Sequence, residues 1–180
     1  MKLRDEPRWE KASNPEYAQL RYDTPAGEAL MEAACQCDVM VESGAWRGLG
    51  STYCLYLALT RPEQWIISFE PDTERFNECV ELYKHEPRIT FFNGRTIDFI
   101  PTIPASIDLL VLDGACGKNE SLDEFKALSR FVSRFIFLDD CNWVSNKNHD
   151  TLQFALADGW KQIAGSESDR NGWSLLEKSV

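Results

Sequence analysis

A carboxylate and a group of glycines follow the first strongly apolar stretch of this chain. Residues 39–43 read VMVES, which places Glu42 near the end of a segment rich in apolar and β-branched side chains. The following turn contains Gly44, Gly48 and Gly50, and a helix-forming stretch starts at Ser51. A strand, a glycine-rich turn and a helix bring backbone N–H groups and a helix N-terminus close to a ligand. The pattern therefore predicts a binding site for a nucleotide-like cofactor.

Acidic residues also close the later apolar segments. They are Glu70, Asp113 and the adjacent pair Asp139 and Asp140. In a doubly wound sheet, ligands bind outside the carboxyl ends of the strands, so these acids are expected beside the glycine turn. A single acid in such a place is usually a helix cap or a solvated loop residue. Their recurrence at several strand ends favours a functional cluster.

The residues at positions 70 and 53 bear on the type of cofactor. Glu70 lies 20 residues after Gly50, where an acid at the end of a second strand accepts hydrogen bonds from both ribose hydroxyls. In the dinucleotide fingerprint, the last glycine permits close packing of helix and strand, but Tyr53 stands at that position here. Glu42 adds a carboxylate that suits a cationic ligand better than a pyrophosphate.

The remaining sequence predicts alternating strands and helices. Apolar runs indicate strands at 39–43, 65–70, 89–94, 107–113 and 134–140. Helices are predicted at about 25–37, 51–59, 72–83, 121–131 and 149–157, with a short turn or helix at 96–100. Segments 160–166 and 173–177 flank a polar turn and predict a β-hairpin.

This order of elements predicts one α/β fold. It is a Rossmann-like, doubly wound, mostly parallel seven-stranded sheet with helices on both faces and a C-terminal antiparallel hairpin. The length of 180 residues fits a single domain. Residues 1–23 lack clear periodicity and are expected to form an irregular N-terminal arm before a single domain at 24–180.

Charge and composition narrow the class of partner and the compartment. A formal net charge of −10 argues against a sequence-independent grip on nucleic acid, which needs Lys and Arg, and favours a small-molecule substrate. No apolar run approaches the roughly 20 residues of a membrane span, and the N-terminus lacks a signal-peptide core. We therefore expect a cytoplasmic protein that does not bind membranes, with its six cysteines reduced. The oligomeric state stays open, a homo-oligomer included.

The ordered set of motifs resembles the class I S-adenosylmethionine-dependent methyltransferases. The resemblance rests on E-x-G-x-x-x-G after the first strand, an acid closing the second, NGRT at 93–96 and an acid closing the fourth. It covers about residues 39–143. Within that fold, VESGAWRG and FLDDCNW are similar to the macrocin-type (TylF-like) sugar O-methyltransferases. They are more distantly similar to the catechol and caffeoyl-CoA O-methyltransferases.

The resemblance implies roles for the residues at the strand ends. The methionyl part of S-adenosylmethionine would contact the turn, the ribose would contact Glu70, and the adenine would lie near the NGRT segment. Thr96 could also be the N-cap of the short helix that follows. The implied cofactor-binding residues are Glu42, Ser43, Gly44, Gly48, Ser51, Glu70, Gly94, Arg95, Thr96 and Asp113.

The same relatives bind a divalent metal ion. The resemblance implies that Asp113, Asp139 and Asp140 hold Mg²⁺, and hard oxygen ligands at adjacent strand ends suit that ion. Asp113 and Asp140 are the candidate catalytic residues, because a carboxylate could take the proton of a metal-bound hydroxyl. In the catechol-type enzymes a lysine base stands three residues after the first metal acid. That position is Cys116 here, so no base is assigned by the resemblance.

The general base and the acceptor therefore have several candidates. Lys118 follows the catechol-type lysine position by two residues, and His149 lies shortly after the last acidic pair. The expected activity is O-methylation of a small-molecule hydroxyl, on a sugar or similar compound. The alternatives are a non-catalytic cofactor-binding or scaffold protein of the same fold and a nicotinamide-dependent oxidoreductase. Five aromatic residues could line an acceptor pocket or pack in the core: Trp9, Tyr17, Tyr22, Trp46 and Trp143.

Overall fold

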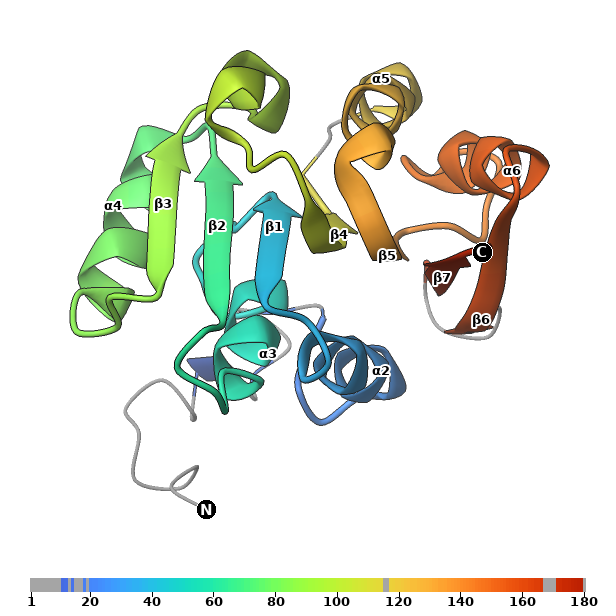
Figure 1. The fold of residues 1–180 in the computed structure, drawn as a ribbon. Helices are drawn as coiled ribbons and strands as arrows, with labels where there is room; N and C mark the ends of the chain where they lie inside the picture. Colours follow the sequence, from blue (N-terminus) through green and yellow to red (C-terminus); the bar gives the residue numbers. More distant parts are fainter. Residues whose placement is uncertain are drawn as a thin grey trace.

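A seven-stranded, mostly parallel sheet forms the centre of the molecule. The computed structural model describes residues 11, 12, 14, 18, 20–114, 117–166 and 171–179. The strand order is β3-β2-β1-β4-β5-β7-β6 (Figure 1). The first five strands pair in parallel, whereas β7 pairs antiparallel with β5 and β6, so the predicted sheet and hairpin are confirmed. The strands are β1 (Val39–Ser43), β2 (Trp65–Glu70), β3 (Ile89–Asn93), β4 (Ile107–Leu112), β5 (Val132–Asp139), β6 (Trp160–Ser166) and β7 (Trp173–Lys178).

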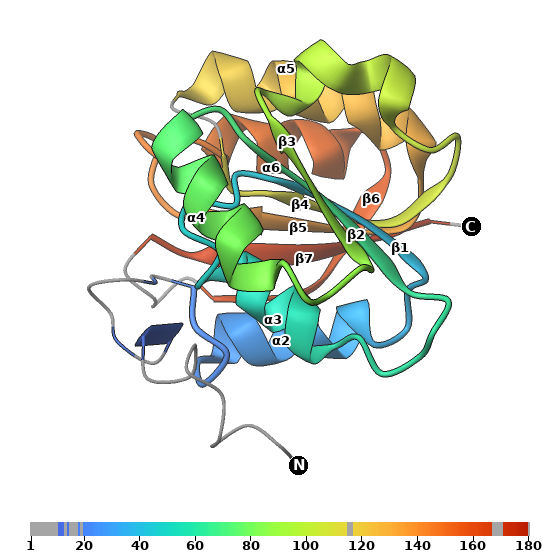
Figure 2. The same cartoon turned by 90° about the vertical axis from the view of Figure 1, so that its left-hand side faces the viewer.

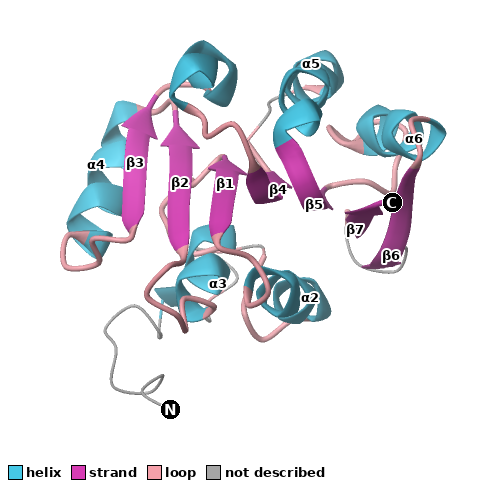
Figure 3. Ribbon diagram, viewed as in Figure 1, coloured by secondary structure: helices cyan, strands magenta, loops and turns pink. Residues whose placement is uncertain are grey.

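Helices alternate with the strands along the chain (Figure 3). Helices α2 and α3 cover one face of the sheet, and α5 and α6 cover the opposite face (Figure 2). Helix α4 packs against β2 and β3. No described helix is both long and apolar enough to cross a bilayer. The helices are α2 (Pro25–Ala34), α3 (Ser51–Leu57), α4 (Thr73–Tyr83), α5 (Lys118–Leu128) and α6 (His149–Ala157), with 3-10 helices η2 (Thr96–Thr102) and η3 (Ser129–Phe131).

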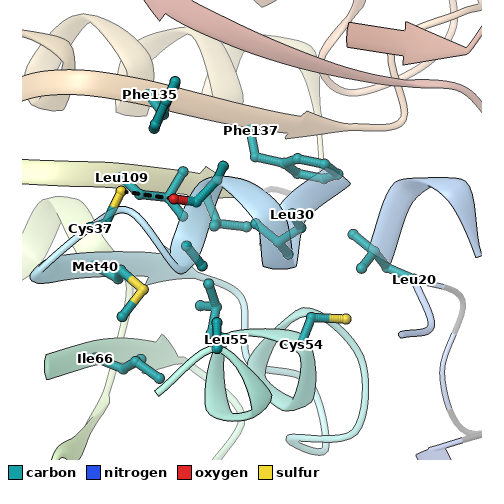
Figure 4. Close-up of a cluster of buried hydrophobic side chains, with 14 of the residues drawn as sticks. Leu20, Leu30, Cys37, Met40, Cys54, Leu55, Ile66, Leu109, Phe135 and Phe137 are labelled. Atoms are coloured by element: carbon teal, nitrogen blue, oxygen red, sulfur yellow. Dashed lines mark hydrogen bonds between the residues drawn. The ribbon is translucent and has the colours of Figure 1, made fainter. Parts of the chain in front are cut away.

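Alternate residues of the central strands supply two hydrophobic cores. In β1, Met40 packs toward α2 and α3, while its neighbour Val41 packs with α5 on the other face. Figure 4 shows the first core, where Leu30 and Leu55 meet Leu109 from β4. Because helices cover both faces, the central strands read as continuous apolar runs, which is why the sequence predicted them well.

Several predicted boundaries are corrected by the structure. The helix predicted to reach position 37 ends at Ala34, and the one predicted at 121–131 begins at Lys118. Glu120 then lies in the first turn of α5, where its charge complements the helix dipole. The same helix ends at Leu128, because the chain tightens into η3 before it enters β5.

The described part of the predicted N-terminal arm packs on the domain. Leu20 is 5% exposed in the first core, and the Tyr22 ring meets the Tyr53 ring edge to face at 5.7 Å. Trp9 and Tyr17 lie outside the described residues, as does Cys116. The described cysteines are free thiols, as expected: Cys35, Cys37, Cys54, Cys79 and Cys141.

Candidate active site

Two glycines bring the ends of β1 and β4 into backbone contact. A Cβ atom on Gly44 would lie 2.2 Å from the Cα atom of Gly114, so only hydrogen atoms fit between them. Gly44 also has a φ of 92°, which side-chain-bearing residues rarely adopt. Its N–H donates to the carbonyl of Phe69 at 2.9 Å, which ties the turn to β2. The strand order reverses between β1 and β4, and ligands of such sheets bind at that point.

Glu42 is fully buried below this turn with one carboxylate oxygen unused. Its Oε2 accepts hydrogen bonds from the hydroxyls of Thr52, at 2.7 Å, and Ser68. Its Oε1 has no hydrogen-bond partner among the described residues. Burial raises the pKa of Glu42 to about 7, although the hydrogen bonds from the Ser68 and Thr52 hydroxyls oppose that rise. A cationic donor would satisfy the free oxygen and favour the ionised form.

Glu70 is fixed in place by two backbone donors. Trp46 donates its N–H to Oε2 at 2.8 Å, and Asp72 donates to Oε1 at 3.0 Å. The residue is 4% exposed, and burial raises the pKa of its carboxyl group. Each oxygen keeps a second lone pair, so the carboxylate can still accept from two hydroxyls. This arrangement suits the ribose contact that the sequence predicted.

Lys147 joins two of the predicted metal carboxylates. Its Nζ donates to Asp113 Oδ1 at 2.7 Å and to the backbone carbonyl of the same residue. The distance from Nζ to Asp140 Oδ2 is 3.4 Å. Ser51 donates its hydroxyl to Asp113 Oδ2 at 3.4 Å, which links the cluster to the start of α3. No motif or spacing in the sequence pointed to this lysine.

Charges in the cluster keep the lysine protonated. Burial by itself would lower the pKa of Lys147, but the charges of Asp113, Asp139 and Asp140 outweigh burial and raise it. Burial raises the pKa of Asp139 well above its usual value, and the two neighbouring carboxylates raise it further. Among the described residues, no group of three His, Cys, Asp or Glu side chains is arranged to hold a metal ion. The structure thus gives no support to the predicted Mg²⁺ site.

Asn148 anchors the loop that carries the lysine. This residue is 1% exposed, and its Nδ2 donates to the carbonyls of Leu112, at 2.9 Å, and Asp139, at 2.6 Å. Its Oδ1 accepts from Ser121 on α5. The loop begins at Asp140, whose φ of 58° turns the chain sharply away from β5. Lys147 is thereby returned to the ends of β4 and β5.

The other base candidates have different partners. The Nδ1 atom of His149, the first residue of α6, lies 3.1 Å from the carbonyl oxygen of Cys141 in the preceding loop. Lys118 forms an ion pair with Asp150 of α6, at 3.6 Å. The contacts seen for these two side chains therefore do not support either as the base.

Ser43 faces α5 and pairs with a second buried acid. Its hydroxyl is 2.9 and 3.0 Å from the two carboxylate oxygens of Glu124. Burial raises the pKa of Glu124 to about 7. The hydroxyl hydrogen of Ser43 is therefore used by Glu124, and the side chain can donate to a cofactor only if this hydrogen bond breaks. The sequence carried a signal for Glu124, because it shares the buried face of α5 with Ser121, Phe125 and Leu128.

The buried carboxyl of Glu124 predicts a pH-dependent stability. Its pKa is raised on folding, so its contribution is fully present below the unfolded value near 4.5 and is lost as pH rises through about 7. Between pH 4.5 and 8, we expect wild type to lose on the order of 2–3 kcal/mol of unfolding free energy relative to Glu124→Gln. Urea unfolding across that range measures the difference, and parallel curves for the two proteins would contradict it.

The remaining predicted cofactor residues fall into two groups. Gly48 faces α4, where its carbonyl accepts from the Tyr83 hydroxyl at 2.5 Å. Gly94 and Arg95 follow β3, and Arg95 pairs with Asp98 at 3.2 Å. Thr96 is fully buried, and its hydroxyl has no partner within the described part of the chain. The N-cap alternative for Thr96 is wrong, because Arg95 holds that position and Thr96 is the first residue of η2.

The fold is the Rossmann-like fold of methyltransferases. The O-methyltransferase TomG from Streptomyces achromogenes, in complex with SAM, has a TM-score of 0.74 at 15% identity, over 99% of this chain and 92% of that chain. SAH-bound PaMTH1 from Podospora anserina has a TM-score of 0.71 at 13% identity, over 96% and 86%. An O-methyltransferase from Bacillus cereus in complex with SAH has a TM-score of 0.67 at 12% identity, over 87% and 82%.

The family follows from the sequence itself. A family model described as a methyltransferase domain matches residues 41–141, more than half of the chain. The chain therefore belongs to this methyltransferase family. No curated protein matches it.

Proposed function

We propose that this chain binds S-adenosylmethionine at the carboxyl ends of β1, β2 and β4 and methylates a hydroxyl of a small molecule, such as a sugar. The unused Oε1 of fully buried Glu42 carries the proposal. A buried carboxylate oxygen without a donor is costly, and a ligand ammonium group would satisfy it. The methionyl part of S-adenosylmethionine carries such a group beside a sulfonium.

Other groups around the turn fit the rest of the cofactor. Glu70 presents a rigid carboxylate for the two ribose hydroxyls, and Thr96 offers a buried hydroxyl near the expected adenine. The solved structures of the same fold add support, because TomG holds SAM and the Bacillus cereus enzyme holds SAH. The adenosine end and the charged end of the cofactor therefore each have a matching group on this chain.

The chain's own residues supply the means for methyl transfer. When bound, S-adenosylmethionine would supply a methyl group on a sulfonium for transfer to the acceptor oxygen, and the electrons of the broken carbon–sulfur bond would stay on sulfur. Asp140 takes the hydroxyl proton on its carboxylate as the acceptor oxygen attacks the methyl carbon. The Lys147 ammonium orients the acceptor oxygen, and the folded site holds both groups in position before the acceptor arrives.

Exposed aromatic rings lie close in sequence to these groups and could contact a sugar ring. Trp46 belongs to the glycine turn and is 51% exposed, and Trp143 belongs to the β5–α6 loop and is 60% exposed. The guanidinium of Arg75 lies 3.4 Å from the centre of the Trp46 ring and holds that ring in place. Stacking of a sugar face on such rings is a common means of recognition.

The site does not fit the Mg²⁺ ion that was expected to assist the reaction. The three carboxylates have the right chemistry, but the Lys147 ammonium lies 2.7 Å from Asp113 Oδ1, where the ion would have to bind. No step of the proposed reaction is therefore routed through a metal ion.

Binding measurements test the cofactor first. Titration calorimetry of the wild type should show 1:1 binding of S-adenosylhomocysteine and no comparable binding of NAD. In Glu70→Ala we expect about 100-fold weaker binding, because the ribose hydroxyls lose a charged acceptor. Glu78→Ala is the control, since that acid pairs with Arg47 at a half-exposed position. Tight binding of NAD without binding of S-adenosylhomocysteine would overturn the proposal.

Transfer assays test the reaction. Wild-type protein and S-adenosylmethionine with a labelled methyl group are incubated with a panel of sugars and phenols. Label should appear in at least one hydroxyl acceptor. Asp140→Asn should lower the rate of methyl transfer to that acceptor and leave the affinity for S-adenosylhomocysteine unchanged. Cofactor binding without transfer to any acceptor would favour the scaffold alternative.

A further inference from the structure

We infer that the Lys147 ammonium is a built-in replacement for the divalent metal ion of the metal-dependent relatives, so that this site works with no metal ion. The inference deepens the proposed methyltransferase function and rests on it. Lys147 is then a residue of the acceptor site, and the divalent metal ion that the acidic strand ends suggested is not required.

The position of the ammonium group carries the inference. A Mg²⁺ ion held by carboxylates lies about 2.0–2.1 Å from each ligand oxygen. The Nζ atom lies 2.7 Å from Asp113 Oδ1 and 3.4 Å from Asp140 Oδ2. An ion bound to these two oxygens would have to occupy the space that the ammonium group fills. Lysine and metal are therefore mutually exclusive in this arrangement.

Electrostatics leads to the same conclusion. A single positive charge already offsets much of the negative charge of Asp113 and Asp140, which lowers the attraction of the cluster for a second cation. A divalent ion would also be repelled by the ammonium at close range. The side chain of Lys147 is only 15% exposed, so this repulsion is weakly screened by water. Metal binding would require the lysine to move out.

The lysine is well anchored against such a movement. Its Nζ also donates to the backbone carbonyl of Asp113, so departure would cost two hydrogen bonds to that residue. The next residue, Asn148, is buried and bonded to the carbonyls of Leu112 and Asp139, which fixes the adjacent backbone. The Lys147 ammonium group is therefore a fixed part of the folded site.

The third N–H group of the Lys147 ammonium is available to bind a substrate. Two of the three N–H groups of Lys147 serve Asp113, whereas the contact with Asp140 is long, at 3.4 Å. An acceptor hydroxyl that bridges Nζ and the Asp140 carboxylate from one side would receive one hydrogen bond and donate another. This is the orientation that a metal ion would impose in a metal-dependent enzyme, achieved here with one side chain.

Manganese binding tests the inference without an acceptor. Free Mn²⁺ is followed by electron paramagnetic resonance as it is titrated with wild type, Asp140→Asn, Lys147→Met and Lys147→Met/Asp140→Asn. We expect no stoichiometric binding to wild type and an affinity at least about tenfold higher in Lys147→Met, since the charge is removed and the three acids remain. The double variant should lose that gain. Lys161→Met, at an exposed position of β6, is the matched control and should behave like wild type.

Each result decides the question. Stoichiometric Mn²⁺ binding to wild type that Asp140→Asn removes would overturn the inference. A folded Lys147→Met protein that fails to bind Mn²⁺ would also overturn it, because the lysine would then not stand in for an ion. If Lys147→Met does not fold, the wild-type titration decides by itself. S-adenosylhomocysteine binding is measured on the same wild-type sample, so a failure of the proposed function is seen separately from the Mn²⁺ result.

Discussion

Gly44→Ala is expected to lose at least about 3 kcal/mol of unfolding free energy and to abolish S-adenosylhomocysteine binding. The new Cβ atom would lie 2.2 Å from the Cα of Gly114, and backbone atoms cannot move aside cheaply. The φ of 92° adds strain, because alanine disfavours that region. Urea unfolding gives the stability, and calorimetry gives the binding.

Gly117→Ala is the matched control for this prediction. No atom lies within 4 Å of the Cβ that this change would add, and the φ of −159° is ordinary extended backbone. We expect stability and binding close to wild type. If Gly44→Ala proved as stable as Gly117→Ala, the close approach of β1 and β4 would be refuted.

Glu42→Gln should lower S-adenosylhomocysteine affinity at pH 8 by roughly 10- to 100-fold. A charge-assisted hydrogen bond to the ligand ammonium would be lost, and such bonds contribute about 1.5–3 kcal/mol. The folded variant should be at least as stable as wild type at pH 8. The pKa of Glu42 is raised to about 7 on folding, so ionisation above that pH costs wild type stability. A weaker affinity would therefore not reflect unfolding.

The pH profile sharpens this second prediction. The ligand ammonium selects the ionised carboxylate, so wild-type affinity should rise between pH 5 and 7 and level off above the pKa of about 7. The Glu42→Gln profile should lack this rise. Glu124→Gln serves as the control, because it removes another buried acid, which lies on α5 and contacts Ser43. An unchanged wild-type affinity across this range would show that Glu42 does not bind the ammonium.

The fold could be predicted from sequence because strand burial is local information. Runs such as 107–112 are mostly apolar on both faces of the sheet, and turns such as the one before α4 carry clear capping residues. Asp72, for example, caps α4 by accepting from the N–H of Arg75 at 3.0 Å. The wrong boundaries lie at helix ends. At the start of α5, for example, the N-cap residue is Gly117, which has no side chain to cap the helix, so the sequence gives no start signal there.

Only part of the candidate site could be predicted from the sequence. Its acids stand at strand ends, and the rule for parallel sheets brings such positions together. Lys147 stands in the polar segment SNKNHD and reaches across 34 residues to Asp113. No period or spacing links the two, because the contact depends on the turn at Asp140 and on the buried amide of Asn148. A contact made by an irregular loop leaves no such pattern in the sequence and is seen only in the three-dimensional structure.

The contact between Gly44 and Gly114 also restricts how this sequence can change over evolutionary time. When two side chains pack together, a larger residue at one position can often be tolerated after the other becomes smaller. Here both partners already have no side chain, and each would meet the other's backbone if it gained one. A substitution at either position therefore has no compensating substitution at the other. We expect descendants of this chain to keep both glycines or to lose the site as a whole.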